Sequence, residues 1–386
     1  MRKRFVIPML ALVAAGCSGS QVEPTGPASQ RPVLAVNPSQ RCPTAATVVV
    51  TNEADLQAAL ASAVPGAVIG IRGTITLTAP AVVGTPDLTL TCADRGAGLV
   101  ADPSLAGDYL IDVYAPRVSV DHLVLDGRIA WGGPYHAVNN GVDRFGEMVR
   151  FTDNIVYCGG LCVILEGGRG AVIADNYFEA TLVVPSGATG IHLQRSNNGV
   201  GSDDARVERN TLIATVPFGA VRFGAMRLRD GARMVVANNV VVGPWSNGLS
   251  LAMMQDAVIE RNSVSGPQNY GLLWTQEGKS SVIRNNRFTG AGIAAGHLGW
   301  DFNPAVPPHV CGNLFVGNNL NGNAGNLGLI FDVRSGANTV VGNPNVVVDN
   351  GTFDCDGDGI IDPNIITGRG AVLRGQTLGP LVSDGV

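Results

Sequence analysis

Short runs of alternating apolar and polar residues recur along most of the chain, separated in each case by an asparagine. One such phrase reads Ala-Val-Ile-Ala-Asp-Asn-Tyr-Phe at 171–178, and similar phrases occupy 205–212, 257–264 and 281–288. Alternation over a few residues predicts β-strands, because successive side chains of a strand point to opposite faces. The phrase therefore predicts two short strands on either side of a corner.

Aligned on their asparagine, the phrases form a series with members 22 to 34 residues apart. Repeats of this length predict a solenoid or a propeller, and these are too short for a four-stranded blade or a helix pair, so we expect stacked coils. Asparagine tolerates the left-handed conformation of a corner, and its amide can bond to the next one along a column. Asn247 lies outside the predicted column and is expected to matter less. The column comprises His122, Asn154, Asn176, Asn210, Asn239, Asn262, Asn286, Asn313 and Asn343.

This pattern resembles the right-handed parallel β-helix of the pectin-lyase-like superfamily, with its internal asparagine ladder. The resemblance extends from Val48 to the late 370s. It implies an all-β solenoid of roughly ten coils, which we assign to residues 48–386. Asparagine-rich turns in some other kind of β protein are the alternative.

One helix is predicted ahead of the coils, over 52–64. Asn52 can cap it, with Asp55 three residues further on, and Pro65 and Gly66 end it. By the resemblance, this helix caps the first coil, which would otherwise expose an open strand edge. Its apolar stripe consists of Leu56, Ala59, Leu60, Ala63 and Val64.

The N-terminus carries an export signal. Arg2, Lys3 and Arg4 precede an apolar run over 5–15, which is too short to cross a bilayer. Small residues then lead to Cys17, an order that resembles a bacterial lipoprotein signal and implies acylation of Cys17 and an outer-membrane destination. An ordinary secretory signal is the alternative. We therefore predict a signal peptide at 1–17 and a flexible tether at 18–47.

Charge excludes some partners. The net charge is −5 and charged residues make up 15% of the chain. That balance gives no reason to expect nucleic acid, or a membrane contact other than the lipid anchor. We expect a monomer.

Six cysteines remain after Cys17, and an even number in an exported protein indicates disulfides. Six cysteines allow fifteen pairings. Nearness in sequence and in adjacent coils favours Cys42–Cys92, Cys158–Cys162 and Cys311–Cys355. A zinc site at Cys158 and Cys162 is the alternative.

A second strand precedes the asparagine phrase in each coil, and its outward residues carry the candidate chemistry. Apolar and polar residues alternate along this strand. If the apolar residues face inward, the acidic residues, the histidine and the arginines align on the outer face of adjacent coils, about 4.8 Å apart. The predicted outward residues are Asp112, Tyr114, Glu166, His192, Gln194, Arg227, Arg229, Ser250 and Ala252.

By the resemblance, this strip is where pectate-lyase-like enzymes have their groove. Cleavage of a uronic-acid polymer by β-elimination needs a base and a cation that neutralises the sugar carboxylate. We assign His192 as the base, Arg227 and Arg229 as carboxylate ligands, and Glu166 as an acid or Ca²⁺ ligand. Asp112 has the same options as Glu166 and, together with Tyr114 and Gln194, would bind substrate.

Two longer segments are predicted walls of the groove. Residues 129–146 include Trp131 and Tyr135, and residues 296–309 include His297 and Trp300. The Arg- and Pro-containing motifs of pectate lyases and the paired aspartates of polygalacturonases are missing. A solvated sheet face with salt bridges is the alternative for the whole strip.

An acidic loop at 354–362 predicts a structural Ca²⁺ site. Oxygen ligands at alternate positions with glycine at the sharp turn suit this ion. Position 12 would be Ile365 instead of glutamate, so the loop resembles the short calcium loops of dockerins and thrombospondin type 3 repeats. An acidic turn without metal is the alternative. The expected ligands are Asp354, Asp356, Asp358 and Asp362.

Together these patterns predict an exported lipoprotein that binds, and possibly cleaves, an acidic polysaccharide. A lyase is favoured over a glycoside hydrolase. A non-catalytic carbohydrate-binding or structural surface protein is the alternative.

Overall fold

A computed structural model describes residue 42 and residues 45–107, 109–128, 133–137, 147–159, 161–181, 189–196, 199–217, 224–300 and 309–375. These residues belong to one compact unit, Ser39–Val386, while the other unit, Met1–Pro38, lies outside the described ranges. The predicted signal peptide, Cys17 and most of the tether are therefore not described. In the described ranges, every helix is too short or too polar to cross a membrane.

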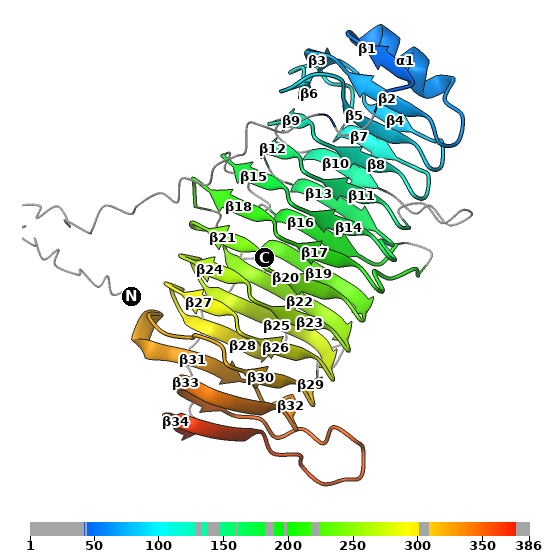
Figure 1. The fold of residues 1–386 in the computed structure, drawn as a ribbon. Coiled ribbons are helices and arrows are strands. Elements are labelled where there is room, and N and C mark those ends of the chain that lie inside the picture. Colours follow the sequence, from blue (N-terminus) through cyan, green and yellow to red (C-terminus); the bar gives the residue numbers. More distant parts are fainter. Residues whose placement is uncertain are drawn as a thin grey trace, which may run out of the picture. The chain divides into compact units, whose positions relative to one another are not determined.

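The described chain winds in coils, and each coil adds a strand to each of three faces (Figure 1). Each strand pairs in parallel with its counterpart in the next coil; β13, for example, pairs with β16 and then β16 with β19. Parallel pairing between coils leaves a continuous interior that is filled mainly by apolar side chains. The predicted parallel β-helix is confirmed.

The strands of the three faces have the following bounds. Face 1 holds β4 (Ala81–Val83), β7 (Tyr109–Val113), β10 (Gly133–Ala137), β13 (Leu161–Glu166), β16 (Thr189–Gln194), β19 (Gly224–Ala232), β22 (Asn247–Gln255), β25 (Tyr270–Lys279), β28 (Ala294–Trp300) and β31 (Leu327–Phe331). Face 2 holds β1 (Val48–Val50), β2 (Val68–Ile71), β5 (Thr89–Cys92), β8 (Ser119–Asp121), β11 (Arg150–Thr152), β14 (Val172–Ala174), β17 (Arg206–Glu208), β20 (Val235–Ala237), β23 (Val258–Glu260), β26 (Val282–Arg284) and β30 (Leu314–Val316). Face 3 holds β3 (Thr74–Leu77), β6 (Gly98–Ala101), β9 (Val124–Gly127), β12 (Ile155–Cys158), β15 (Tyr177–Ala180), β18 (Thr211–Ala214), β21 (Val240–Val242), β24 (Ser263–Ser265) and β27 (Arg287–Thr289).

The last coils depart from this plan. The strands β33 (Thr339–Asp349) and β34 (Ile365–Arg374) are long, and β33 pairs with both β30 and β31, so it spans faces 2 and 1. Short strands β29 (Val310–Cys311) and β32 (Ser335–Gly336) lie at the corner that leads from face 1 to face 2. A 3₁₀ turn, η1, covers Ala324–Asn326.

An asparagine ladder lies at the corner between faces 2 and 3. The side-chain amide of Asn262 donates to the carbonyl of Val236 at 2.8 Å and to Asn286 Oδ1 at 2.9 Å. Its own Oδ1 accepts from the backbone and side chain of Asn239 at 3.0 and 2.9 Å. The same bonds repeat between coils, so the predicted column is confirmed over most of its length. This first ladder comprises Asn154, Asn176, Asn210, Asn239, Asn262, Asn286 and Asn318.

Two members of the predicted column were wrong. Leu123, and not His122, takes the ladder position of its coil, because the backbone N–H of Leu123 donates to Asn154 Oδ1 at 3.0 Å. Asn313 lies at the other corner, and Asn318 takes its place next to Asn286. The side chain of Asn343, the last predicted member, lies outside what is described.

The reason first given for asparagine at the corner was also wrong. The left-handed residue is the one before the ladder position, with φ 60° at Asp175, 54° at Arg209 and 54° at Arg261. That residue makes the sharp bend, so the asparagine after it turns its amide inward to bond to the next coil. Inward hydrogen bonding, and not left-handed backbone, is what requires asparagine.

A second ladder lies at the corner between faces 1 and 2, near the C-terminal end of the described coils. Asn313 donates to Asn338 Oδ1 at 2.9 Å, and Asn338 donates to Asn364 Oδ1 at 2.9 Å. Ser281 begins it, since its backbone N–H donates to Asn313 Oδ1 at 3.0 Å. Two corners of the later coils are thus held by buried amides.

The predicted cap is a shorter helix, α1 (Glu53–Ala61), three residues short of the expected end at Val64. Asn52 caps it as predicted, accepting from the backbone N–H of Asp55 at 2.9 Å. Leu56 and Leu60 are buried, whereas Val64 is exposed. Glu53 accepts from the backbone N–H of Thr78 at 2.8 Å, which fixes α1 to the chain after β3.

All three predicted disulfides are present. Their Cα atoms lie 5.4, 5.2 and 5.9 Å apart, in the usual range for a disulfide. The pairing of Cys158 with Cys162 removes the thiolates that a zinc site would need. The pairs are Cys42–Cys92, Cys158–Cys162 and Cys311–Cys355.

Candidate functional site

Face 1 presents the predicted strip of outward side chains. In β13 and β16 the inward residues Val163 and Ile191 are fully buried and lie opposite one another. The residues next to them along each strand point to the opposite, outward face. Register therefore places His192 opposite Arg227, and Glu166 opposite Gln194, in adjacent coils. We call Glu166, His192, Gln194, Arg227 and Arg229 the outer strip.

His192 is buried in the outer strip, at 6% exposure, instead of lying on a solvated face. Neither ring nitrogen has a hydrogen-bond partner among the described residues. Burial, together with the positive charges of Arg227 and Arg229, lowers the pKa of His192 to about 3. A general base works best with a pKa near the working pH, so these surroundings do not favour the predicted base role. The surroundings of His192 favour a neutral imidazole, which has one nitrogen that can donate a hydrogen bond to a ligand and one that can accept.

Stability should depend on pH through His192. The folded pKa lies below the unfolded value, so the unfolded chain binds a proton that the folded chain rejects between about pH 6.5 and 3. The free energy of unfolding should be constant above pH 6.5 and fall by up to about 1.4 kcal/mol per pH unit below it. Urea denaturation of wild type and His192→Gln measures this, and the slope should flatten in the variant. An unchanged slope in His192→Gln contradicts the prediction.

Polar contacts connect the outer strip to the corner where face 1 ends. Gln194 donates from Nε2 to Glu166 Oε1 at 2.7 Å. Arg229 donates from Nη2 to Gln276 Oε1 at 3.1 Å, and its Nε lies 4.0 Å from a carboxylate oxygen of Asp230. The chain then turns, so the residues after the strip line the corner.

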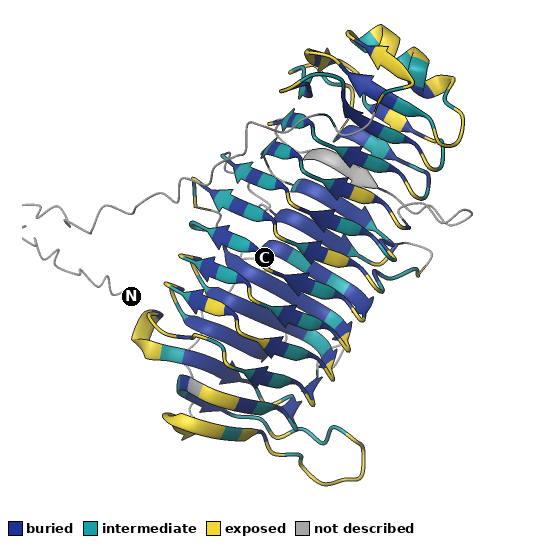
Figure 2. Ribbon diagram, viewed as in Figure 1, coloured by how far each residue is buried: buried dark blue, intermediate teal, exposed yellow. Residues whose placement is uncertain are grey.

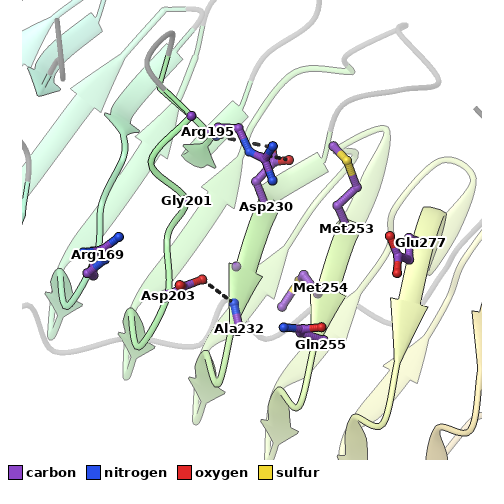
Figure 3. Close-up of a pocket in the computed structure, with 12 residues that line it drawn as sticks. Arg169, Arg195, Gly201, Asp203, Asp230, Ala232, Met253, Met254, Gln255 and Glu277 are labelled. Carbon is purple, nitrogen blue, oxygen red and sulfur yellow. Dashed lines mark hydrogen bonds and ion pairs between the residues drawn. The ribbon is translucent and has the colours of Figure 1, made fainter. Parts of the chain in front are cut away.

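A hollow of about 290 Å³ lies at this corner, on the surface over several successive coils (Figure 3). We call it the corner groove. Its size is near the lower end for small-ligand sites, which suits one or two sugar units of a longer polymer. The lining residues are Arg169, Arg195, Gly199, Gly201, Asp203, Asp230, Gly231, Ala232, Met253, Met254, Gln255 and Glu277.

Asp230 organises the groove. It is buried, and its carboxylate accepts from the backbone N–H of Arg195 at 3.3 Å and lies 3.7 Å from the Arg195 guanidinium (Figure 3). Asp203 Oδ1 accepts from the backbone N–H of Ala232 at 2.8 Å. The Arg195 side chain is 57% exposed, so this ion pair has one buried partner and one exposed partner. The Arg195 backbone is fixed by Asp230, and its guanidinium faces the solvent beside the groove.

Left-handed backbone occurs at the groove, as it does at other corners of the described coils. Asp230, Met253 and Gln276 have φ of 57°, 50° and 62° near the ends of their face-1 strands. A bulky residue such as methionine rarely adopts this conformation, so Met253 is the least expected of the three.

At its far end the groove reaches Glu277, whose carboxylate lies near two bases. Lys279 Nζ is 3.6 Å and His309 Nε2 is 3.5 Å from Glu277 Oε1. Lys279 is the one lysine outside the predicted signal. The groove thus combines guanidinium groups at one end with a mixed acid and base cluster at the other.

The other predicted substrate-binding residues are placed as follows. Asp112 lies in the column of outward residues, and burial followed by the charge of Asp112 raises the pKa of Tyr114. The backbone of Tyr135 pairs with Ile111 and Val163, and its side chain is not described. Trp131 lies outside the described residues.

The second predicted wall contributes a buried pair. His297 is buried and its Nε2 lies 2.8 Å from Asp332 Oδ2, with the ring of Tyr270 centred 5.0 Å away. Residues 301–308 of that wall are not described. His297 therefore packs into the outer layer of face 1 instead of lining the corner groove.

Sequence reasoning missed the groove residues Arg195, Asp203, Asp230 and Glu277. The available signal was their position, since Arg195 and Asp230 directly follow the strip residues Gln194 and Arg229. Alternation along a strand ends at the corner, and the side chains beyond it follow no period.

The acidic loop brings three of its four predicted ligands together. One carboxylate oxygen from each of Asp354, Asp356 and Asp362 lies within 4.8 Å of the others. Asp358 is not part of this group; its carboxylate accepts from the backbone N–H of Ile360 at 2.8 Å. Backbone N–H groups of Gly359 and Gly357 keep the pKa of Asp354 below its usual value. Three carboxylate oxygens at this spacing fit a hard cation such as Ca²⁺.

Comparison with known proteins found solved structures of low similarity. A search of curated protein sequences found no match. An alginate lyase from Paenibacillus sp. str. FPU-7 superposes with a TM-score of 0.44 at 12% identity, over 85% of this chain and 97% of that one. A PL6-family polysaccharide lyase from Pseudopedobacter saltans gives 0.42 at 13% identity, over 86% and 93%. The Dettilon tailspike protein gives 0.38 at 15% identity, over 86% and 66%.

At these scores the likenesses carry no information on activity. The family model described as "Right handed beta helix region" matches residues 139–343, which is more than half of the chain. The stacked coils, the parallel pairing and this match all indicate the same fold. The chain belongs to the right-handed β-helix family.

Proposed function

We propose that this protein binds an acidic polysaccharide in the corner groove and the adjoining outer strip. The observation that carries the proposal is the exposed guanidinium of Arg195 at the mouth of the groove, 3.7 Å from the buried carboxylate of Asp230. Arginine presents a planar fork that matches a carboxylate in two hydrogen bonds. The exposed part of this fork can donate to a uronate carboxylate.

The remaining groove residues suit the rest of a sugar. Carboxylates such as Asp203 and Glu277 accept hydrogen bonds from sugar hydroxyls, and Arg169 offers a second cation. The groove runs across several coils, and the coils repeat every ~4.8 Å. A polymer lying along the coils therefore meets similar positions repeatedly, as suits a chain of sugars.

Binding is better supported than cleavage. A lyase needs a base at the proton beside the uronate carboxylate, and His192, with its pKa lowered to about 3, is a weak one. A hydrolase would need two acids facing one bond across a defined gap. Cleavage by β-elimination stays a prediction, to be read from the absorbance of the unsaturated product after incubation with polyuronides.

Affinity for polyuronides should depend on Arg195. We expect Arg195→Ala to weaken binding of polygalacturonate or alginate by about tenfold to a hundredfold, since one charge-assisted hydrogen-bonding partner is lost. Isothermal titration calorimetry measures this, with a neutral glucan as the ligand control. Arg261→Ala is the protein control, because Arg261 is exposed and pairs with Glu260 at 3.2 Å away from the groove. Equal affinity in wild type and Arg195→Ala, or no binding to any polyuronide, contradicts the proposal.

We also propose that the acidic loop binds Ca²⁺ as a structural ion. Asp354, Asp356 and Asp362 would hold it, and the ion would neutralise three carboxylates that otherwise repel one another. The disulfide Cys311–Cys355 ties this loop to β29, so a bound ion would stiffen the last coils.

Removal of Ca²⁺ should therefore lower the melting temperature. A ligand that binds only the folded chain stabilises it by mass action, by about 2.7 kcal/mol at a hundred times its dissociation constant. Differential scanning calorimetry in EDTA and in millimolar Ca²⁺ compares the two states, with Asp356→Asn as the variant. Identical melting temperatures in both buffers would show that the loop is only a turn.

The proposed location is the bacterial outer membrane, through a lipid on Cys17. The basis is the basic start, short apolar run and small residues before Cys17. Cells fed a fatty-acid probe should label the wild type and not Cys17→Ala; equal labelling of both would exclude the anchor.

A further inference from the structure

The two ends of the described coils differ. Helix α1 packs on β1, β3 and β4 at the first coil. The last strand, β34, pairs along one edge with β33, and no described strand pairs with its other edge. Nine of its ten residues are exposed, and Figure 2 shows this strand as mostly exposed beside largely buried neighbours. A solenoid whose last strand stays open offers its backbone to another chain.

The edge has few of the features that usually prevent pairing. Natural edge strands carry charged residues, above all lysine, or proline and bulges, or they are very short. β34 is ten residues long and has no lysine, proline or acidic residue; its charged residues are Arg369 and Arg374, and its pairing with β33 has one irregularity of register. Exposed apolar residues gather on it and on the loop before it. They are Ile360, Ile361, Ile365, Val372 and Leu373.

Opposite charges lie at the two ends of β34. The acidic loop with Asp354, Asp356 and Asp358 directly precedes β34, and Arg374 ends the strand. Arg374 is exposed and lies 3.7 Å from Asp349. One end of the edge is therefore acidic and apolar, and the other is basic and apolar.

We propose that a second copy of this chain covers the open end, with the two β34 strands pairing antiparallel about a twofold axis. Antiparallel pairing sets the start of one strand beside the end of the other. Asp358, the loop carboxylate outside the proposed Ca²⁺ group, is then set toward Arg374 of the other copy, and Ile365 meets Val372 and Leu373. A twofold interface needs this self-complementarity, in which each patch contacts the other patch of the partner.

Analytical ultracentrifugation of the full chain over a dilution series tests the proposal. The wild type should pass from monomer to dimer as concentration rises. The double variant Val372→Lys and Leu373→Lys should weaken dimerisation about tenfold or more, because charged side chains would replace the apolar contacts with Ile365 of the other copy. Val82→Lys is the matched control: Val82 is 47% exposed, against 40% and 41% for the other two, and lies on β4 in the early coils. Circular dichroism melts confirm that each variant is folded.

The charges of the interface can be tested separately. Arg374→Glu should weaken the dimer, and high salt should also weaken the wild-type dimer.

Other occupants of the edge give different results. If residues 376–386 cover the edge themselves, the full chain stays monomeric and a chain ending at Gly375 dimerises, which overturns the proposal. A wild type that stays monomeric at every concentration, or a lysine variant that dimerises as well as the wild type, also overturns it.

Discussion

Replacing Asn262 by leucine should lower the free energy of unfolding by about 3 kcal/mol or more. The substitution removes two hydrogen bonds donated by the side chain of Asn262 and two accepted by its Oδ1. The backbone and amide N–H groups of Asn239 and the carbonyl of Val236 then remain buried without these partners. Each buried group left without a partner costs about 1–3 kcal/mol.

Chemical denaturation at equilibrium measures the effect, with Asn321→Leu as the control. Asn321 is exposed, so its replacement should change stability by no more than about 0.5 kcal/mol. Asn247, which sequence reasoning favoured for comparison, is buried and therefore unsuitable. Equal losses in Asn262→Leu and Asn321→Leu would mean that the ladder contributes nothing beyond an ordinary turn.

Replacing Gly278 by alanine should cost about 3 kcal/mol. A Cβ at this position would lie 2.2 Å from Nε1 and 2.3 Å from Cε2 of Trp274, inside van der Waals contact. Trp274 is fully buried in the interior of the coils and cannot swing into solvent. Overpacking a filled core typically costs 1–3 kcal/mol or more, because the backbone must shift.

Gly84→Ala is the matched control for this second substitution. A Cβ at Gly84 meets no atom within 4 Å, so alanine should leave stability unchanged or raise it by up to about 1 kcal/mol. Thermal and urea denaturation of both variants compare the two positions. A loss below about 0.5 kcal/mol in Gly278→Ala would show that the indole has room to move.

The sequence predicted the fold well because the coils repeat a simple physical requirement. Each coil has alternating strands and one buried amide, so the sequence repeats once per coil, as at Asn176, Asn210 and Asn262. The series failed where two corners look alike. Asn313 and Asn318 each follow a glycine with φ near 64°, so sequence alone does not tell which corner either one occupies.

The site was predicted less completely, for two physical reasons. Alternation placed His192 and Arg227 on one face, but it says nothing of burial, and burial sets the pKa of His192. The corner groove is lined by residues such as Arg195 and Glu277, which lie where the alternation of the strands ends and no period identifies them. Residues that act at corners must therefore be found from the structure.

A crystal structure of the protein with a bound oligouronate tests the central claim most directly. We predict that a sugar carboxylate lies within hydrogen-bonding distance of the Arg195 guanidinium, in the groove between Arg169 and Glu277. The same oligosaccharide should be missing from crystals of Arg195→Ala grown and soaked in the same way. A ligand bound elsewhere on the coils, or bound equally in the variant, would contradict the assignment of the corner groove.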